Sequence, residues 1–146
     1  TIFYFFVSIQ GSMMSLPQVQ RVTHFNNWVV GHAHVGVLGF AAMTALGGLY
    51  YVLPRITGKP LYSRLLADLQ YWLVLLGVIG FTVVLTIVGL IQGNAWLNGE
   101  TIYRVLPELH MYYVLRVSIG FLIMSGAYIG LYNIFRTLFF NPGGKS

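Results

Sequence analysis

The 146-residue sequence contains no cysteine, which excludes disulfide bonds, cysteine-ligated iron–sulfur clusters and a C-x-x-C-H site for covalent haem within it. Charged residues are also scarce, because they make up 8% of the sequence against about 25% in an average soluble domain. Only three residues are acidic. This composition excludes an ordinary water-soluble domain, whose surface would carry many more charges.

Hydrophobic residues make up 57% of the sequence and are arranged in long runs. Several runs reach the roughly 20 residues that a helix needs to cross a bilayer. The runs and the breaks between them predict helices over residues 1–14, 25–53, 63–96 and 107–140. Pro54 is expected to follow the second helix, and Pro107 to lie in the first turn of the fourth. The predicted fold class is all-α and integral to the membrane, with four transmembrane segments of which the first is partial.

The chain opens directly in an apolar run after Thr1, with no charged segment before it, so this run does not have the pattern of a signal peptide. We expect residue 1 to lie inside a transmembrane helix whose preceding part is missing or made separately. Residues 15–21 are expected to form a short connection to the second helix.

The basic residues indicate an orientation in the membrane. The net charge of +5 is better explained by loop charges than by nucleic-acid binding, so no nucleic-acid partner is expected. Five of the eight basic residues fall on one side of the predicted bundle: Arg55, Lys59, Arg64, Arg136 and Lys145. The positive-inside rule therefore predicts a multi-pass protein whose C-terminus is cytoplasmic.

Some small and aromatic residues have an ordinary structural interpretation. The pairs Gly89–Gly93 and Gly126–Gly130 have the small-xxx-small spacing that lets membrane helices approach closely. Tyr113, beside a second tyrosine, is interpreted as part of an interfacial aromatic belt.

Two histidines, His32 and His34, lie inside the second apolar segment, where a titratable side chain is costly and indicates function. Two residues of an α-helix subtend about 200° and about 3 Å of rise. The imidazoles therefore leave the helix on nearly opposite sides at nearly one depth, so they cannot bind the same ion. Glycines beside them leave little side-chain bulk on the helix surface, so a flat porphyrin can approach it. Imidazole is a standard haem ligand. We interpret the pair as ligands of two haem irons; the alternative is hydrogen bonding to a neighbouring helix or to water.

The sequence around these histidines resembles the catalytic subunit of the haem-copper oxidases, and the C family of cbb-type cytochrome c oxidases best. The residues that carry the resemblance are Gln10-Gly11-Ser12-Met13-Met14, followed by Thr23-His24-Phe25-Asn26-Asn27-Trp28-Val29-Val30-Gly31-His32-Ala33-His34-Val35-Gly36-Val37-Leu38-Gly39. The start of the family's last core helix is similar to Glu108-Leu109-His110-Met111-Tyr112-Tyr113-Val114-Leu115-Arg116.

The resemblance implies that the four segments are the ninth (in part) to twelfth helices of a twelve-helix haem-copper oxidase bundle. It implies two b-type haems: His32 would bind the high-spin haem iron at the oxygen-reducing site, and His34 the low-spin haem iron. His24 matches a histidine near the propionates of the high-spin haem. Copper would be bound by protein outside this chain segment, and calcium near the propionates is a further expected cofactor.

The same resemblance implies partners and a location. The partners are the upstream helices of the same catalytic subunit, or a separate chain carrying them, together with cytochrome c-type haem subunits and membrane lipids. The location is a prokaryotic inner (cytoplasmic) membrane.

Three further residues are candidates for the site. Arg116 is expected near the depth of the haems and needs an anionic partner there, which is either a haem propionate or an acid of another subunit. Gln10 stands where the family usually has a glutamate near the proximal histidine, and Asn27 stands where an aspartate is usual. Glutamine can still hydrogen-bond an imidazole, although it cannot make it electron-rich as a carboxylate does.

The predicted function is the haem-binding part of a terminal respiratory oxidase, which reduces oxygen to water with electrons from cytochrome c and translocates protons. Two alternatives stay open. The segment Leu16-Pro17-Gln18-Val19 is also similar to nitric oxide reductases of the same superfamily. The other alternative is a non-catalytic membrane scaffold that holds two haems for electron transfer.

Overall fold

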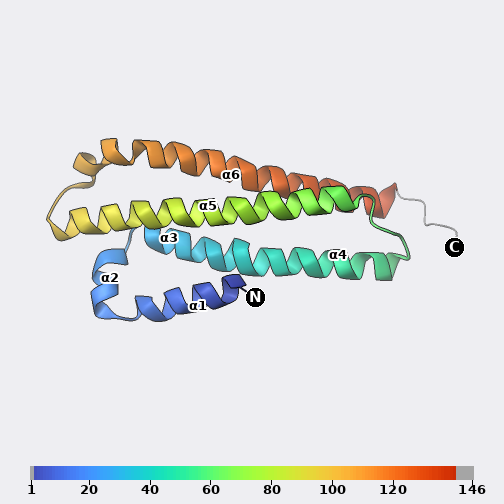
Figure 1. The fold of residues 1–146 in the computed structure, drawn as a ribbon, viewed down its shortest axis with the longest axis horizontal. Helices are drawn as coiled ribbons and strands as arrows, with labels where there is room; N and C mark the ends of the chain where they lie inside the picture. The colour runs from blue at the N-terminus through green and yellow to red at the C-terminus, as the bar shows by residue number, and fades with distance from the viewer. Residues whose placement is uncertain (1, 141–146) are drawn as a thin grey trace.

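The computed structural model describes residues 2–140, and these residues form helices joined by short connections (Figure 1). In chain order the helices are α1 (Ile2–Met14), α2 (Pro17–Thr23), α3 (Asn27–His34), the π-helix η1 (Val35–Ala42), α4 (Met43–Thr57), α5 (Arg64–Leu97) and α6 (Ile102–Phe139). The described residues contain no strand, which confirms the predicted all-α class.

Three helices are long and apolar enough to cross a membrane. The first joins α3, η1 and α4 over Asn27–Thr57, and the others are α5 and α6, with 31, 34 and 38 residues respectively. Each exceeds the roughly 20 residues that a bilayer requires. Helix α1 is also apolar but has only 13 residues. The predicted integral membrane class is thereby confirmed.

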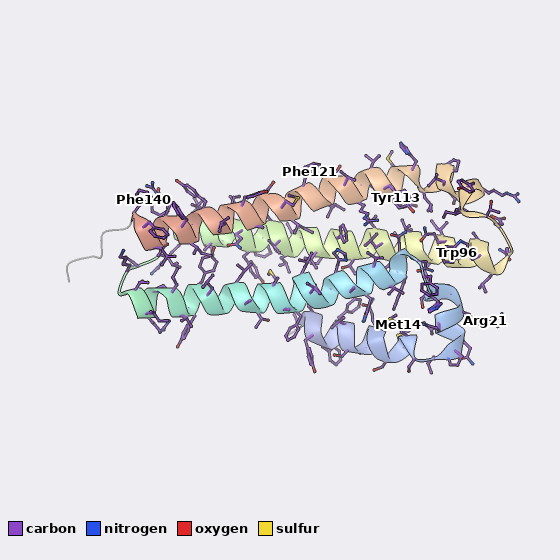
Figure 2. The ribbon with its side chains drawn as sticks, turned by 180° about the vertical axis from the view of Figure 1, so that it is seen from behind. Met14, Arg21, Trp96, Tyr113, Phe121 and Phe140 are labelled. Carbon is purple, nitrogen blue, oxygen red and sulfur yellow. The ribbon has the colours of Figure 1, made fainter. Side chains whose placement is uncertain are left out.

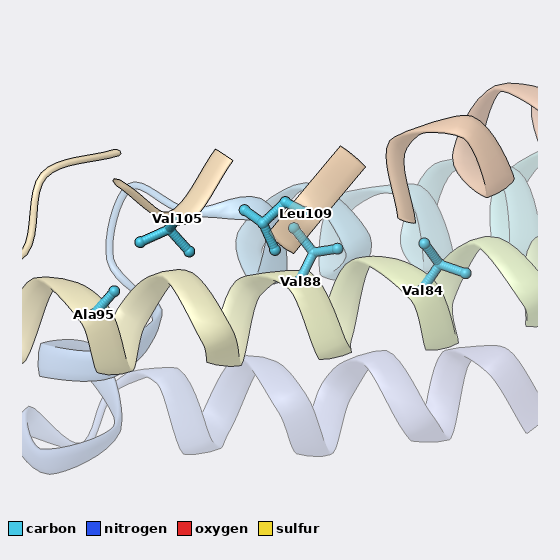
Figure 3. Packing of buried hydrophobic residues seen from close by; sticks show 5 residues of the cluster. All are labelled: Val84, Val88, Ala95, Val105 and Leu109. Carbon is cyan, nitrogen blue, oxygen red and sulfur yellow. The ribbon is translucent and has the colours of Figure 1, made fainter. Parts of the chain in front are cut away.

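The long helices lie side by side in one layer, with α5 between α6 and the α3–η1–α4 helix (Figure 1). Helix α1 packs along the other side of α3–η1–α4, while α2 closes one end of the bundle. A cluster of buried apolar side chains joins the two longest helices: Val84, Val88 and Ala95 of α5, and Val105 and Leu109 of α6 (Figure 3). Because the layer is open on both faces, many large apolar side chains point outward, as expected where lipid or further helices cover them.

Several predicted helix boundaries are wrong. Residues 15–21 are not a plain connection, because Pro17 opens the short helix α2, where its missing N–H costs nothing. Pro54 does not follow the second long helix but lies inside α4, which continues to Thr57 and ends at Gly58 with φ of 65°. Pro107 does not open α6, which begins five residues earlier, at Ile102. The Tyr103 side chain is 82% exposed, so water at this end can reach the backbone that Pro107 leaves without an N–H donor.

The second long helix begins at Asn27 rather than at residue 25, because the chain turns sharply before it. Phe25 has a positive φ of 57°, a conformation that costs free energy for a bulky residue. Asn26 then caps α3: its side-chain oxygen accepts from the Trp28 N–H at 2.9 Å. Its amide also donates to the Gly89 carbonyl at 2.9 Å. This cap fastens the start of α3 to α5.

Glycines allow α5 to approach its neighbours closely, as their spacing predicts. A Cβ atom on Gly89 would collide with the backbone of Trp28, and one on Gly93 with the Val22 carbonyl. On the other side of α5, a Cβ on Gly126 of α6 would lie 2.9 Å from the Val74 side chain. These contacts confirm the close helix packing and set how α3 and α5 face each other.

Candidate functional site

His32 faces α1 from the second turn of α3. Its Nδ1 lies 3.4 Å from Oε1 of Gln10, a buried side chain of α1. If Nδ1 carries the proton and donates to that oxygen, Nε2 is left with its lone pair free for a metal. Gly11 leaves space beside the ring, because a Cβ there would lie 3.6 Å from Cε1 and 3.9 Å from Nε2. The indole of Trp28 stacks parallel to the imidazole, with ring centroids 6.0 Å apart.

His34 faces the other side of the bundle. Its Nδ1 lies 2.7 Å from the Val30 carbonyl oxygen one turn earlier, and since a carbonyl only accepts, this nitrogen is the one that donates. Nε2 is therefore left as the acceptor. The imidazole also contacts the ring of Phe81 on α5, with centroids 4.8 Å apart. The two histidines thus point to opposite sides of one helix, as the helical spacing predicts, and each is held through Nδ1.

An apolar groove of about 500 Å³ lies beside His34, between the helix that carries it and α6. Its other lining residues include Leu38, Phe81, Val117 and Gly120. A Cβ added to Gly120 would meet nothing within 4 Å, so this glycine leaves the groove wide. A long apolar groove with one free imidazole nitrogen fits the axial ligation of a flat, apolar haem.

A hydrogen-bonded network of polar side chains lies at the end of this groove that is nearer the connection between α5 and α6. The Asn27 backbone N–H and side-chain amide both donate to Oε1 of Gln92, at 3.0 and 2.8 Å. Nε2 of Gln92 donates to the Tyr113 hydroxyl at 3.1 Å. Nη1 of Arg116 donates to Oδ1 of Asn27 at 3.3 Å. Three long helices therefore meet in one network, to which sequence reasoning contributed only Asn27 and Arg116.

Tyr113 and Gln92 are the site residues that sequence reasoning missed. Tyr113 does not belong to a lipid-facing aromatic belt, because its hydroxyl bonds two side chains between the helices. Figure 2 places Tyr113 on α6 toward the end of the bundle where Arg21 and Trp96 lie. Gln92 could have been identified from the sequence, because it is a polar side chain within an otherwise apolar helix.

Arg116 has one side-chain partner in the network and donor capacity to spare. Its guanidinium lies 5.8 Å from the centre of the Phe81 ring, the ring that also contacts His34. Within residues 2–140 the one ion pair joins Arg104 and Glu100, so no carboxylate of the described chain neutralises Arg116. A buried or half-buried guanidinium next to the His34 groove is suited to an anionic group of a ligand held there.

His24 lies away from His32, in the sharp turn between α2 and α3. Its Nδ1 is 2.8 Å from Nε2 of Gln20 on α2, and its ring contacts that of Phe25 with centroids 3.9 Å apart. The structure therefore brings together His32 with Gln10, and Asn27 with Arg116, but it places His24 in a separate pair. No three His, Asp or Glu side chains of residues 2–140 cluster closely enough to bind a metal ion between them.

The chain is similar to known proteins over nearly its whole length. Residues 1–139 match the family model described as cytochrome C and quinol oxidase polypeptide I. A cytochrome c oxidase subunit 1 homolog of Agrobacterium tumefaciens is 33% identical over 144 residues, which cover 93% of this chain and 27% of that protein. The cbb3-type cytochrome c oxidase subunit CcoN1 of Stutzerimonas stutzeri is 29% identical, covering 93% of this chain and 30% of that protein. The cytochrome c oxidase subunit 1 of Rhodobacter capsulatus is 30% identical over 96% of this chain and 28% of its own length. The chain thus spans less than a third of these relatives.

Proposed function

Because the chain belongs to the family of cytochrome c and quinol oxidase polypeptide I, we propose that it is the haem-binding part of the catalytic subunit of a terminal respiratory oxidase. The complete subunit takes electrons from cytochrome c, reduces oxygen to water and translocates protons. The observation that carries the proposal is the arrangement of His32 and His34, whose Nδ1 atoms are both held while their Nε2 atoms stay free on opposite sides.

In this proposal His34 would hold a low-spin b-type haem, and His32 would hold a high-spin b-type haem at the oxygen-reducing site. The haems supply the redox chemistry when bound. The chain's own contribution is positional. The Val30 carbonyl orients the His34 ring, and the Gln10 amide oxygen orients the His32 ring. Because both rings leave one short stretch of backbone, the separation of the two centres is set by helix geometry.

Arg116 and Asn27 form the outer end of the low-spin haem site in this proposal. Asn27 is held by Gln92, and it positions the Arg116 guanidinium by accepting from Nη1. The remaining N–H groups of Arg116 then bind a haem propionate as charge-assisted hydrogen bonds. His24, which lies in the turn beside Phe25, would contact the propionates of the high-spin haem.

Membership of the family supports the rest of the proposal. Four segments, the first of them α1, take the places of the ninth to twelfth helices in a twelve-helix bundle whose other helices supply the copper ligands. Cytochrome c-type subunits and lipids are partners, the inner membrane is the location, and the C-terminal end is cytoplasmic. The basic residues support this orientation: Lys59 bonds the Leu138 carbonyl, so the basic turn after α4 and the end of α6 lie together. Lys145, also counted for this orientation, lies outside the described residues.

Metal analysis of the purified assembly separates this proposal from its alternatives. We expect two non-covalent b-type haems and one copper per catalytic subunit. Two haems with non-haem iron in place of copper would identify a nitric oxide reductase instead. Two haems with neither metal would support a non-catalytic dihaem scaffold. Calcium is determined in the same analysis, and its absence would contradict the proposed calcium ion.

The Arg116→Gln variant tests the propionate contact. Removing a cation beside a haem favours the oxidised, more positive state, so the midpoint potential of the low-spin haem should fall by roughly 50 mV. Redox titration followed by visible absorbance measures it.

The matched control for this titration is Arg104→Gln, which removes an exposed guanidinium paired with Glu100 at the same end of the bundle. Its potentials should equal those of the wild type. Equal shifts in the two variants would show a long-range charge effect and contradict a specific contact.

A further inference from the structure

Arg136 lies in a cage of aromatic rings at the end of α6 opposite the Arg116 network. Its guanidinium carbon is 4.8 Å from the centre of the Tyr62 ring, 5.2 Å from that of Phe140 and 6.0 Å from that of Tyr132. The Tyr62 and Tyr132 rings meet edge to face, with centroids 6.2 Å apart. The π-faces of these rings attract the positively charged guanidinium. Among the described residues, neither tyrosine hydroxyl of the cage accepts a hydrogen bond from Nε of Arg136.

The edge of the Arg136 guanidinium is unsatisfied. Its Nε atom is buried and has no hydrogen-bond partner among the residues that the structure describes. A buried donor without an acceptor costs free energy, so such a group requires an explanation. The ion pair of the described residues is at the other end, so an acceptor for this donor must come from outside residues 2–140, and a bound anion is one that would supply it.

The surroundings of the cage are rigid because hydrogen bonds tie the connection before α5 to α6. Asn133 accepts from the Ser63 N–H at 3.1 Å and donates to the Ser63 carbonyl at 2.8 Å. The Tyr62 N–H donates to the Thr137 hydroxyl at 3.0 Å. Asn133 and Thr137 are completely buried. Tyr62 is therefore held beside Arg136 before any ligand binds.

Charge and apolar surface at this end favour one class of ligand. Lys59 places its ammonium at the last turn of α6 by donating to the Leu138 carbonyl at 2.8 Å, and it keeps further N–H donors. Arg64 starts α5 at the same end, where Asp68 is the nearby acid and is exposed. The apolar rings of Phe135, Phe139 and Phe140 are exposed beside the cage, and Figure 2 shows Phe140 at this end of the bundle.

We propose that Arg136, caged by Tyr62, Tyr132 and Phe140 and assisted by Lys59, binds the phosphate of an anionic phospholipid headgroup. The guanidinium edge donates to two phosphate oxygens, a geometry that suits arginine. The exposed phenylalanines contact the acyl chains of the same lipid. Arg136 lies in the last turn of a membrane-spanning helix, which is the depth of the headgroups. This lipid site does not depend on which metals the assembly holds.

The experiment titrates phosphatidylglycerol into the purified assembly in neutral-detergent micelles and follows the midpoint of thermal unfolding. The wild type should be stabilised by phosphatidylglycerol much more than by phosphatidylcholine. In Arg136→Gln the apparent affinity for phosphatidylglycerol should fall roughly tenfold, through loss of charge and of two hydrogen bonds. Arg136→Lys keeps the charge but not the planar fork, so we expect a loss of about threefold. This second variant keeps the test decisive if the glutamine variant does not fold.

The matched control is Arg55→Gln, which removes the same charge at the same end. Arg55 lies over the Tyr51 ring at 3.4 Å and donates to the Tyr51 carbonyl at 2.7 Å, so its guanidinium is engaged within its own helix. Wild-type affinity is expected for this variant. Equal losses in the Arg55 and Arg136 variants, or wild-type affinity in both Arg136 variants, would overturn the proposal. Inorganic phosphate alone should not stabilise the protein, and if it did so as well as phosphatidylglycerol, the site would be one for free phosphate.

Discussion

Replacing His34 by alanine should remove the low-spin haem that we propose it holds, and should leave the high-spin haem in place. The His34 Nε2 is the nitrogen that this chain would offer to a haem in the 500 Å³ groove between its helix and α6. Loss of an outer-shell partner alone costs 10- to 100-fold in metal affinity, so loss of the ligand itself should abolish stable binding. Oxygen consumption should fall by more than about 100-fold, because electrons reach the second haem through the first. Reduced-minus-oxidised absorbance spectra and haem extraction measure the result.

The His32→Ala variant gives the reciprocal result, with the high-spin haem lost and the low-spin bands retained. His110→Ala is the matched control, since His110 is an exposed histidine on α6 outside both sites. Its spectrum should equal that of the wild type. An unchanged spectrum in His34→Ala, or loss of the same bands in both His32→Ala and His34→Ala, would contradict the assignment of one haem to each imidazole.

Replacing Gly89 by alanine should destabilise the assembly by roughly 2 to 3 kcal/mol, although alanine is the better helix former by up to about 1 kcal/mol. The added Cβ would collide with the backbone of Trp28, so α3 must move away from α5. That movement also pulls the Asn26 cap from the Gly89 carbonyl. The midpoint of thermal unfolding should fall by about 5 to 10 °C, and the low-spin haem bands should broaden because the His34 groove loses its shape.

Gly48→Ala is the control for this change, because it adds the same methyl group inside an apolar helix. A Cβ on Gly48 would meet nothing within 4 Å, and the residue is exposed. The unfolding midpoint should stay level or rise. If Gly89→Ala left both the midpoint and the spectrum unchanged, the close approach of α3 and α5 would not position the site.

The long-range contacts of the site could not be predicted from the sequence. Sequence reasoning identified Asn27 and Arg116 separately, but their hydrogen bond joins residues 89 positions apart. Tyr113, which completes the network with Gln92, was interpreted as part of an aromatic belt, and Gln92 was not identified as a site residue. Whether a polar side chain in an apolar helix faces lipid or a neighbour depends on the rotation of that helix in the bundle. Packing sets this rotation, through contacts such as that of Gly89 with Trp28.

Composition and periodicity also could not predict two local features of the backbone. The π-helix over Val35–Ala42 follows the histidines directly, and its run of apolar residues and glycines carries no signal that separates a π-helix from an apolar α-helix. Pro54 lies in the last turn of α4, so the ring interrupts the helix only three residues before its end at Thr57. The caging of Arg136 by Tyr62 brings together residues 74 positions apart in the chain.

The sequence by itself determined the membrane-spanning helices and the opposed directions of His32 and His34. Both follow from short-range rules, since the length of an apolar run decides whether a helix can span a bilayer, and two residues always subtend about 200°. The resemblance already suggested Gln10 near His32 and Arg116 near the depth of the haems. Only the tertiary structure decided the contacts themselves: the distance between His32 and Gln10, and the apolar groove beside His34 that is bounded by α6 and has Arg116 at one end. Those contacts depend on the register of helices far apart in sequence, which is fixed where glycines let their backbones touch.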